Sequence, residues 1–372
     1  MNSDSHTAYG VLVAPPERWS NDFKNIGDYI QSIASRQFYP HVDCYVNREN
    51  ICNFASPDNK RVKCILNGWW MWHPENWPPS EDINPLPISM HISPIHSDDM
   101  FTTRSILWFK QFEPIGCRDY ITLDLLRSRN IEAYYSGCLT LTLGRTYKNL
   151  NPENNKRICF IDPYLDVNSS KKRFLLYFLL FKAPYTILKM SSKDFFSRRW
   201  NDGYKHKNWF KNLLYVANFY KVYSSMFSNR VLRNAEYYTH MVELSNDSHD
   251  TMLKTADSLL KKYSESRYIV TSRIHAGLPC LGIGTPVIFV THESLEGLSW
   301  NAGRLKGLIE LLRVLRVSKT KLIAVDDSFK VRKKIDCNFM FSNKLNWIPI
   351  AAKLETICSD FIKSRDGLNG EV

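Results

Sequence analysis

Short apolar runs alternate with amphipathic stretches along most of the chain. Residues 8–13, Ala-Tyr-Gly-Val-Leu-Val, predict a first strand, and apolar residues three and four apart predict a helix over 23–38. Further short apolar runs lie at 42–46, 62–66, 87–92, 131–135 and 139–143, and helical stretches lie at 98–112 and 118–129. Strands that alternate with helices indicate a mostly parallel, doubly wound sheet.

A second alternation follows the polar stretch at 144–156, whose composition is typical of a domain boundary. Strands are predicted at 157–161, 237–242, 267–272, 286–291 and 320–325, and helices at 248–264, 276–283, 303–316 and 349–364. An insertion at about 170–230 also has a helical pattern. The sequence therefore predicts an α/β fold with two Rossmann-like domains, residues 1–150 and 151–372, and a cleft between them.

The 372 residues are enough for two hydrophobic cores. Nine scattered cysteines without a Cys-x-x-Cys pair predict reduced core residues, and neither a disulfide framework nor a zinc site is expected. The first residues lack the pattern of a signal peptide, and the most apolar run, 174–181, is far shorter than a membrane helix requires. We therefore expect a cytoplasmic protein, soluble or peripheral to a membrane.

Lys and Arg exceed Asp and Glu by 12, and 9 of these excess positive charges lie between Lys171 and Lys211. Aromatic residues are interleaved with these cations: Phe174, Tyr177, Phe178, Phe181, Phe195, Phe196, Trp200, Trp209 and Phe210. This mixture favours an anionic membrane surface as a partner. Nucleic acid is not expected, because no nucleic-acid-binding fold accompanies the charge. The alternative is a solvated basic face over an ordinary helical core.

The segment from Thr271 to Val290 has the pattern strand, turn, helix, strand, and it places Arg273 and His275 at the turn. In parallel α/β sheets, ligands bind at the carboxyl ends of strands, beside helix N-termini that attract anions. Arg273 and His275 are therefore candidates for an anion site. The alternative is a surface cation followed by a polar helix cap.

Arg118, in Ile115-Gly-Cys-Arg-Asp-Tyr, is predicted to lie at the start of a helix. A cation at that end opposes the helix dipole, so its position requires a neighbouring negative charge. A bound anion would supply this charge, and the carboxylate of Asp119 is the alternative.

Two further segments have the composition of a ligand site. Asn25-Ile-Gly27-Asp28 is a turn at a predicted helix start, where glycine lets a ligand approach the backbone, although Asn and Asp are also ordinary helix caps. Asn67 and Trp69 follow an apolar strand and open a run rich in tryptophan. Such rings often line a sugar site, and the alternative is a loop packed on its own aromatic residues.

Taken together, these segments resemble the polysaccharide pyruvyl transferase family. The motifs, in order, are Asn25-Ile-Gly-Asp28, Gly116-Cys-Arg-Asp119, Ser136-Gly-Cys-Leu-Thr-Leu-Thr142, Thr239-His240, Ser272-Arg-Ile-His275, Gly284-Thr-Pro286 and Arg304-Leu-Lys-Gly-Leu308. The resemblance implies the fold of the two-domain, GT-B type glycosyltransferases. It implies phosphoenolpyruvate as the donor, with no separate cofactor. The acceptor would be a sugar of a cell-surface polysaccharide, such as capsule or exopolysaccharide, or its lipid-linked precursor.

Site roles follow from the resemblance and from the chemistry of the donor. Arg118 and Arg273 suit the phosphate and carboxylate of phosphoenolpyruvate, and Arg304 is a third candidate. His275 is the expected proton donor, with His240 or Asp28 as a base toward the acceptor. The expected substrate-binding residues are Asn25, Gly27, Asp28, Asn67, Trp69, Ser136, His240 and Arg304. No metal is required by this chemistry.

The loop at 291–297 departs from the family pattern, because it lacks a Lys that some members carry there. Arg304 or Lys306 is the candidate replacement. Two other functions remain open: a nucleotide-sugar-dependent glycosyltransferase of GT-B type, and a catalytically silent, membrane-associated subunit of a polysaccharide assembly complex. With a lipid-linked acceptor, the expected location is the inner face of the plasma membrane.

Overall fold

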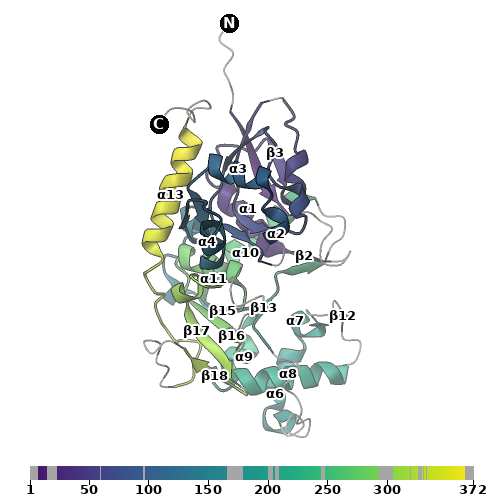
Figure 1. The fold of residues 1–372 in the computed structure, drawn as a ribbon. Coiled ribbons are helices and arrows are strands. Elements are labelled where there is room, and N and C mark those ends of the chain that lie inside the picture. The colour runs from purple at the N-terminus through teal and green to yellow at the C-terminus, as the bar shows by residue number, and fades with distance from the viewer. Residues whose placement is uncertain are drawn as a thin grey trace.

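The chain forms a mixed α/β structure built on parallel sheets (Figure 1). The computed structural model describes residues 7–14, 23–58, 60–94, 97–165, 179–199, 204–205, 209–243, 248–292, 305–318, 320–325, 329, 331 and 333–364. The predicted α/β class is confirmed. Parallel pairing follows from the alternation of strands and helices, because a parallel partner can be reached only by a crossover connection.

Residues 8–135 form two adjoining four-stranded parallel sheets. The first has the order β3-β1-β4-β6, with β1 at Ala8–Val13, β3 at Cys44–Asn47, β4 at Val62–Ile65 and β6 at Ile83–Leu86. The second has the order β5-β7-β8-β9, with β5 at Gly68–Trp70, β7 at Met90–Ile92, β8 at Ile115–Cys117 and β9 at Ala133–Tyr135. The helices of this half are α1 at Ile26–Arg36, α2 at Ser97–Met100, α3 at Thr103–Gln111 and α4 at Tyr120–Arg127.

Residues 157–324 form a six-stranded sheet of order β13-β10-β15-β16-β17-β18, in which only the edge pair β17–β18 is antiparallel. Its strands are β10 at Arg157–Ile161, β13 at Glu236–Tyr238, β15 at Ser266–Thr271, β16 at Val287–His292, β17 at Arg313–Ser318 and β18 at Lys321–Ala324. The principal helices are α10 at His249–Ser264, α11 at Ile274–Ile283 and α13 at Ile348–Lys363. The predicted strands at 157–161, 267–272 and 286–291 are thus confirmed to within one residue.

The insertion is helical where it is described, as predicted. It contains α6 at Pro184–Ser191, α7 at Asp194–Ser197, α8 at Trp209–Tyr223 and α9 at Asn229–Asn234, with a small hairpin of β11 (Arg198–Arg199) and β12 (Tyr204–Lys205). Of the aromatic residues interleaved with the cations, Phe195 and Phe196 are buried, because they pack in the core of the six-stranded sheet. Phe174, Tyr177, Phe178 and Trp200 lie outside the described residues.

Several predicted elements differ from the structure. The strand predicted at 237–242 is divided into β13 and β14 (Met241–Glu243), which belong to different sheets. The helix predicted over 303–316 is, where described, a turn, a short 3₁₀ helix (η7, Ile309–Leu311) and strand β17. Pairing with β16 buries Val314 and Leu315, and this tertiary contact outweighs the helical spacing of the leucines that precede them. The apolar run at 139–143 belongs to a 3₁₀ helix (η3, Leu139–Arg145), because it packs against α11 instead of joining a sheet.

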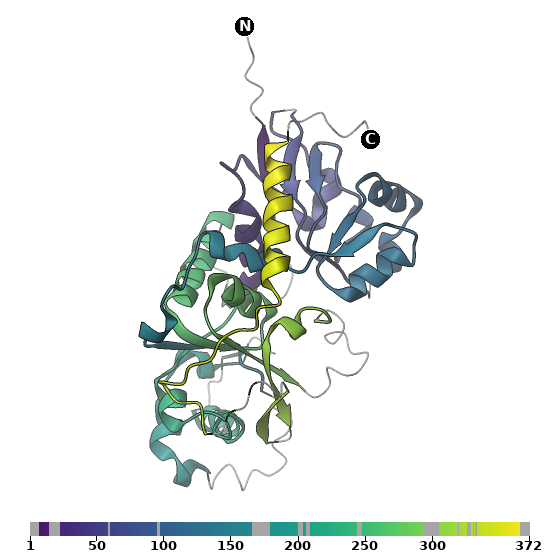
Figure 2. The ribbon, with the colours of Figure 1, turned by 90° about the vertical axis from the view of Figure 1, so that its left-hand side faces the viewer.

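Contacts between the two halves are extensive. Strand β2 (Phe23–Asn25) of the first half pairs with β14 (Met241–Glu243) of the second half. Helices α1, α10 and α11 share one hydrophobic core with η3, and this core draws on both sheets. Helix α13 packs back along the first half, where Lys63 Nζ donates a 3.0 Å hydrogen bond to the carbonyl of Phe361 near the helix end (Figure 2). The sheets of the first half and the six-stranded sheet of the second half are therefore packed together at the carboxyl ends of their strands.

Candidate active site

Arg118 and His275 lie in contact, although 157 residues separate them in the chain. Arg118 follows β8 of the first half, and His275 lies in the first turn of α11, after β15 of the second half. The distance from Arg118 Nη1 to His275 Nε2 is 3.4 Å. The carboxyl ends of strands from the two sheets thus meet at one point, which is where parallel α/β sheets bind ligands.

The Arg118 side chain is almost completely buried, with 2% exposure. Its Nη1 group lies 3.4 Å from Gln31 Oε1, and its Nε has no hydrogen-bond partner among the described residues. An unmatched donor on a buried guanidinium is costly, because the group has lost its water without gaining an acceptor. A negatively charged ligand beside Arg118 would provide that acceptor.

Asp119 is the nearest carboxylate to Arg118, at 3.7 Å from Nε, but its oxygens have other partners. Oδ2 lies 2.6 Å from Nδ1 of the buried His91, and Oδ1 caps helix α4 by accepting from Thr122 N at 3.0 Å. Burial alone would raise the pKa of Asp119, but the charge and hydrogen bond of His91, with smaller effects of Arg118 and Thr122, hold the pKa below its ordinary value. Asp119 is therefore an ionised helix cap that balances only part of the Arg118 charge.

The start of α1 lies between the two histidine-bearing segments. Asn25 caps the helix by accepting from Gly27 N at 3.1 Å, which is the ordinary capping role considered for it. A Cβ atom on Gly27 would lie 3.3 Å from His240 Nδ1 and 3.3 Å from His275 Cβ. Gly27 therefore lets α1 pack closely against both histidines. The space that a Cβ atom would take is lined by protein atoms.

A second network holds Arg273. Asp162, which follows β10, accepts a 2.8 Å hydrogen bond from Arg273 Nε and a 2.9 Å bond from the backbone N–H of His240. The Arg273 side chain is 37% exposed, so it lies at the edge of the site, whereas Arg118 lies inside it. The structure therefore places both arginines beside α11, one buried and one at the surface.

His240 is buried, and its Nε2 lies 2.8 Å from the hydroxyl of Tyr263. Burial lowers the pKa of His240 to about 4; the charge of Asp162 opposes this shift, and that of Arg273 adds to it. Burial also raises the pKa of Tyr263 well above its ordinary value, so both groups are neutral near pH 7. The role of His240 as a base stays a prediction.

Asp28, in the first turn of α1, extends the site toward the tryptophan-rich segment. Its Oδ1 accepts from Gln31 Nε2 at 3.3 Å and lies 3.4 Å from Arg48 Nη1. Arg48 is buried and also contacts Glu49, and its guanidinium lies 5.7 Å from the ring centre of Trp69. A continuous chain of polar contacts thus runs from Arg48 through Asp28 and Gln31 to Arg118.

The remaining predicted residues take different positions. Asn67 is buried and donates a 3.0 Å hydrogen bond to the Gln31 carbonyl, while its Oδ1 has no partner among the described residues. The ring centre of Trp69 lies 4.6 Å from that of Trp72, and the two rings are tilted by 39°. Ser136 donates to the carbonyl of Cys117 at 3.1 Å and so ties the ends of β8 and β9 together.

Arg304 lies outside the described residues, as do residues 293–297 of the loop that lacks the lysine.

Sequence reasoning missed three residues that complete the site: Gln31, Arg48 and Asp162. Asp162 had a usable signal, since it is a carboxylate directly after a predicted strand. Gln31 and Arg48 had none, because they become relevant only through contacts with residues 87 and 20 positions away.

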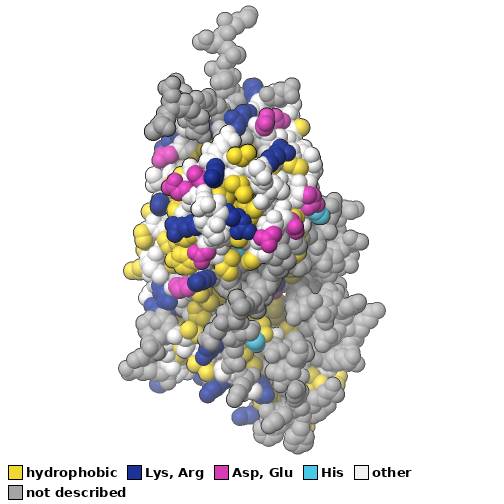
Figure 3. Space-filling view, in the orientation of Figure 1, with side chains coloured by type: hydrophobic (Ala, Val, Ile, Leu, Met, Phe, Trp, Pro, Cys, Tyr) yellow, Lys and Arg dark blue, Asp and Glu magenta, His cyan; other side chains and the backbone are white. Residues whose placement is uncertain are grey.

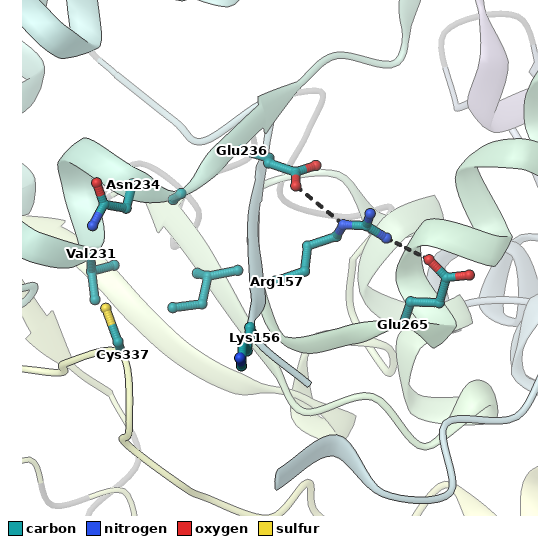
Figure 4. A pocket seen from close by; sticks show the side chains of 9 residues that line it. Lys156, Arg157, Val231, Asn234, Glu236, Glu265 and Cys337 are labelled. Atoms are coloured by element: carbon teal, nitrogen blue, oxygen red, sulfur yellow. Dashed lines mark hydrogen bonds and ion pairs between the residues drawn. The ribbon is translucent and has the colours of Figure 1, made fainter. Parts of the chain in front are cut away.

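A cavity of 430 Å³ lies elsewhere, at the amino ends of β10 and β13 (Figure 4). Its lining includes Arg157, which lies between Glu236 at 3.2 Å and Glu265 at 2.6 Å. The charge of this arginine is already matched by two carboxylates, unlike that of Arg118. The buried donor without an acceptor, Arg118 Nε, lies at the carboxyl edge of the sheets, and this edge is therefore the candidate site. Within the described residues, no three His, Cys, Asp or Glu side chains are grouped as a metal site would require.

A buried arginine, a neighbouring histidine and a helix N-terminus lie together between the parallel sheets of this α/β protein, and they form its candidate anion site. A family model described as polysaccharide pyruvyl transferase matches residues 25–294, which is well over half of the chain and includes Arg118, Arg273 and His275. This chain belongs to the polysaccharide pyruvyl transferase family, and the predicted family is thereby confirmed. Searches of curated proteins and of solved structures find no match.

Proposed function

We propose that this transferase moves the pyruvyl group of phosphoenolpyruvate onto two hydroxyls of one sugar, forms a pyruvate ketal and releases phosphate. Family membership supports pyruvyl transfer onto polysaccharide in general. The observation that carries the proposal is the 3.4 Å contact between Arg118 and His275, which brings a buried cation and a proton-transfer group to one point.

In this proposal the donor lies beside the N-terminus of α11. Arg118 binds one anionic group of phosphoenolpyruvate through its fork of N–H donors, and Arg273 binds the other from the edge of the site. The backbone N–H groups that open α11 add to the attraction for an anion. Each charge-assisted hydrogen bond contributes about 1.5–3 kcal/mol in such an environment.

His275 is the proposed general acid. It protonates the methylene carbon of phosphoenolpyruvate, which leaves C2 cationic, and a sugar hydroxyl attacks C2 and gives up its proton to a base. The bond from C2 to the phosphate oxygen then breaks, inorganic phosphate leaves with its electron pair, and the second hydroxyl attacks C2 and loses its proton. One of the two hydroxyl protons replaces the proton that His275 gave to carbon, and the other is taken up by the departing phosphate, so the ketal and inorganic phosphate balance the reactants.

Asp28 is the proposed base toward the acceptor. It is partly exposed, with 17% side-chain exposure, and Gln31 links it to Arg118 within the chain of polar contacts. His240 is the weaker candidate, because its Nε2 is already engaged with Tyr263 inside the core. The acceptor would be a sugar of a cell-surface polysaccharide or of its lipid-linked precursor. We place the reaction in the cytoplasm, at the inner face of the plasma membrane.

We also propose that the chain forms two Rossmann-like domains, 1–150 and 151–372, in the manner of the two-domain glycosyltransferases. The separate parallel sheets at 8–135 and 157–324 support this division. The return of α13 to the first half adds a contact between the two proposed domains.

The test is mass spectrometry of candidate polysaccharides and lipid-linked sugars after incubation with phosphoenolpyruvate. The expected product has gained pyruvate minus water, and an equal amount of inorganic phosphate appears. Transfer of a sugar from a UDP- or GDP-sugar instead would establish the glycosyltransferase alternative. Unchanged product formation by a folded His275→Ala variant would overturn the assignment of His275.

A further inference from the structure

The described part of the insertion exposes large apolar side chains on its outer surface. Phe181 is 85% exposed, Tyr185 63%, Leu188 48%, Trp209 65% and Phe210 42%. Single exposed apolar residues are normal on a soluble protein, whereas a group of them marks an interaction surface. Here five such residues lie on α6, on the helical turn before it and at the start of α8.

Helix α6 carries apolar side chains on both of its faces. Its inner face buries Ile187 and Met190 in the core of the six-stranded sheet, while Tyr185 and Leu188 remain outside. The start of α8 lies against the end of α6, since Asn212 donates a 3.2 Å hydrogen bond to the carbonyl of Ser191. Large apolar side chains that remain outside a helix whose inner face is already buried are suited to a partner.

The outer face is also basic. Lys182 and Lys189 are exposed among the apolar residues, and the guanidinium of Arg233 lies 5.0 Å from the ring centre of Tyr185. The described residues 179–199 contain five Lys or Arg and one Asp, a net charge of +4. By contrast, Lys and Arg are mixed with Asp and Glu over the visible part of the first half (Figure 3). The partner must therefore combine negative charge with an apolar interior.

We propose that the outer face of α6, with the start of α8, docks on an anionic lipid surface. Lipid headgroups would pair with the lysines, and the aromatic side chains would reach the boundary between headgroups and acyl chains, where such rings are enriched. A second copy of the chain would bring two surfaces of the same positive sign together, which is unfavourable. Nucleic acid would match the charge but would give Leu188 no apolar environment.

This surface lies at the end of the molecule opposite β3 and α3 of the first half (Figure 1). No helix of the described chain has both the length and the apolar character needed to cross a bilayer, so the docking proposed is at the surface. The inference rests on exposure and charge alone, and it holds whatever the reaction of the candidate site.

The test is co-sedimentation of the full chain with vesicles of phosphatidylcholine, alone or mixed with phosphatidylserine. Binding should require phosphatidylserine and should weaken between about 0.05 M and 0.5 M salt, because salt screens the headgroup charge. Changing Lys182→Glu and Lys189→Glu together should lower binding at least about tenfold at low salt. The variant with Phe181→Ser, Tyr185→Ser and Leu188→Ser should lower it by about tenfold or more at both salt concentrations.

The matched controls are Leu107→Ser and Lys110→Glu, two exposed residues of α3 in the first half, which should bind like the unchanged chain. Circular dichroism verifies that every variant is folded. The proposal is overturned if the folded chain ignores anionic vesicles at low salt, or if the α6 variants bind as well as the controls. It is also overturned if the triple serine variant loses self-association of the chain and keeps vesicle binding. Binding of an oligonucleotide to the same lysines in preference to vesicles would overturn it as well.

Discussion

At the scale of single residues, the account depends on Arg118, a buried arginine with only part of its donor capacity used. Replacement by lysine keeps the charge but removes the planar fork. We expect Arg118→Lys to lower kcat/KM by about 10- to 150-fold, because one charge-assisted hydrogen bond contributes about 1.5–3 kcal/mol. Steady-state kinetics would measure this loss. Arg104→Lys, at an exposed position of α3, is the matched control and should be neutral.

His275 has a different predicted signature, because a general acid acts on the rate more than on donor affinity. We expect His275→Gln to lower kcat by about 10²–10⁴-fold, the usual contribution of positioned proton transfer. Binding of phosphoenolpyruvate, measured by thermal shift, should change far less. If the variant keeps the normal kcat, another group supplies the proton.

His240 makes stability depend on pH. Its pKa falls from 6.5 in the unfolded chain to about 4 in the folded one, so the unfolded state binds a proton first as the pH drops. The contribution of neutral His240 to the free energy of unfolding is complete above about pH 6.5 and is lost between about pH 6.5 and 4. Between about pH 7.5 and pH 5 it should fall by about 2 kcal/mol.

Urea unfolding at these two pH values, for the native chain and for His240→Gln, isolates the effect of His240 from other titrating groups. The glutamine variant should lose less stability on acidification, by about 2 kcal/mol. An identical loss in both proteins would mean that His240 is solvated or protonated in the folded state.

Arg273 and His275 could be identified from the sequence, because they follow a predicted strand where parallel sheets bind ligands. Arg118 could be identified because its charge opposes the dipole at a predicted helix start. The contact between Arg118 and His275 could not be derived, because nothing local records a pairing across 157 residues. The same limit hid Gln31, which lies inside a helix and looks like any polar residue there. Ser136 shows the converse case, since its place in a motif did not distinguish a ligand contact from a hydrogen bond between strand ends.

At the scale of elements, α11 positions the site because it packs very closely on η3. A Cβ atom on Gly282 would lie 2.3 Å from the carbonyl oxygen of Leu141, and backbone cannot move aside as a side chain can. We therefore expect Gly282→Ala to lower the free energy of unfolding by about 1–3 kcal/mol or more, as overpacked sites do. Chemical denaturation would measure the change.

Gly277, in the same helix, is the matched control. Its added Cβ would lie 3.4 Å from side-chain atoms of Leu312, which is ordinary contact. Alanine also favours a helix over glycine, so Gly277→Ala should be neutral or stabilising by up to about 1 kcal/mol. Equal destabilisation by both substitutions would show that the close approach of η3 and α11 is not the cause.

Elements were predictable where the local pattern and the tertiary contacts agree. Strands β10, β15 and β16 are buried parallel strands with continuous apolar runs, and their predicted bounds were accurate. Strand β17 was mistaken for part of a helix, because leucines near 308–312 have a helical spacing and only pairing with β16 fixes the strand. Strand β8 is only three residues long and was not predicted, although it carries Arg118 to its position.

At the scale of the whole molecule, the site exists only because two parallel sheets meet at their carboxyl ends. Strand β2 pairs with β14, the backbone N–H of Ile26 bonds to the carbonyl of His240 at 2.7 Å, and one core runs through α1 and α11. The alternation of strands and helices predicted two α/β halves. It could not predict their mutual orientation, which depends on packing between distant segments such as η3 and α11.

The central claim is that Arg118 and His275, from the two halves, form one site for phosphoenolpyruvate. Calorimetric titration of phosphoenolpyruvate into the native chain, Arg118→Lys and Arg104→Lys tests it without knowledge of the acceptor. The account predicts binding of one phosphoenolpyruvate per chain, retained in Arg104→Lys and weakened by about tenfold or more in Arg118→Lys. Equal affinity in all three proteins, or binding of a UDP-sugar in place of phosphoenolpyruvate, would contradict it.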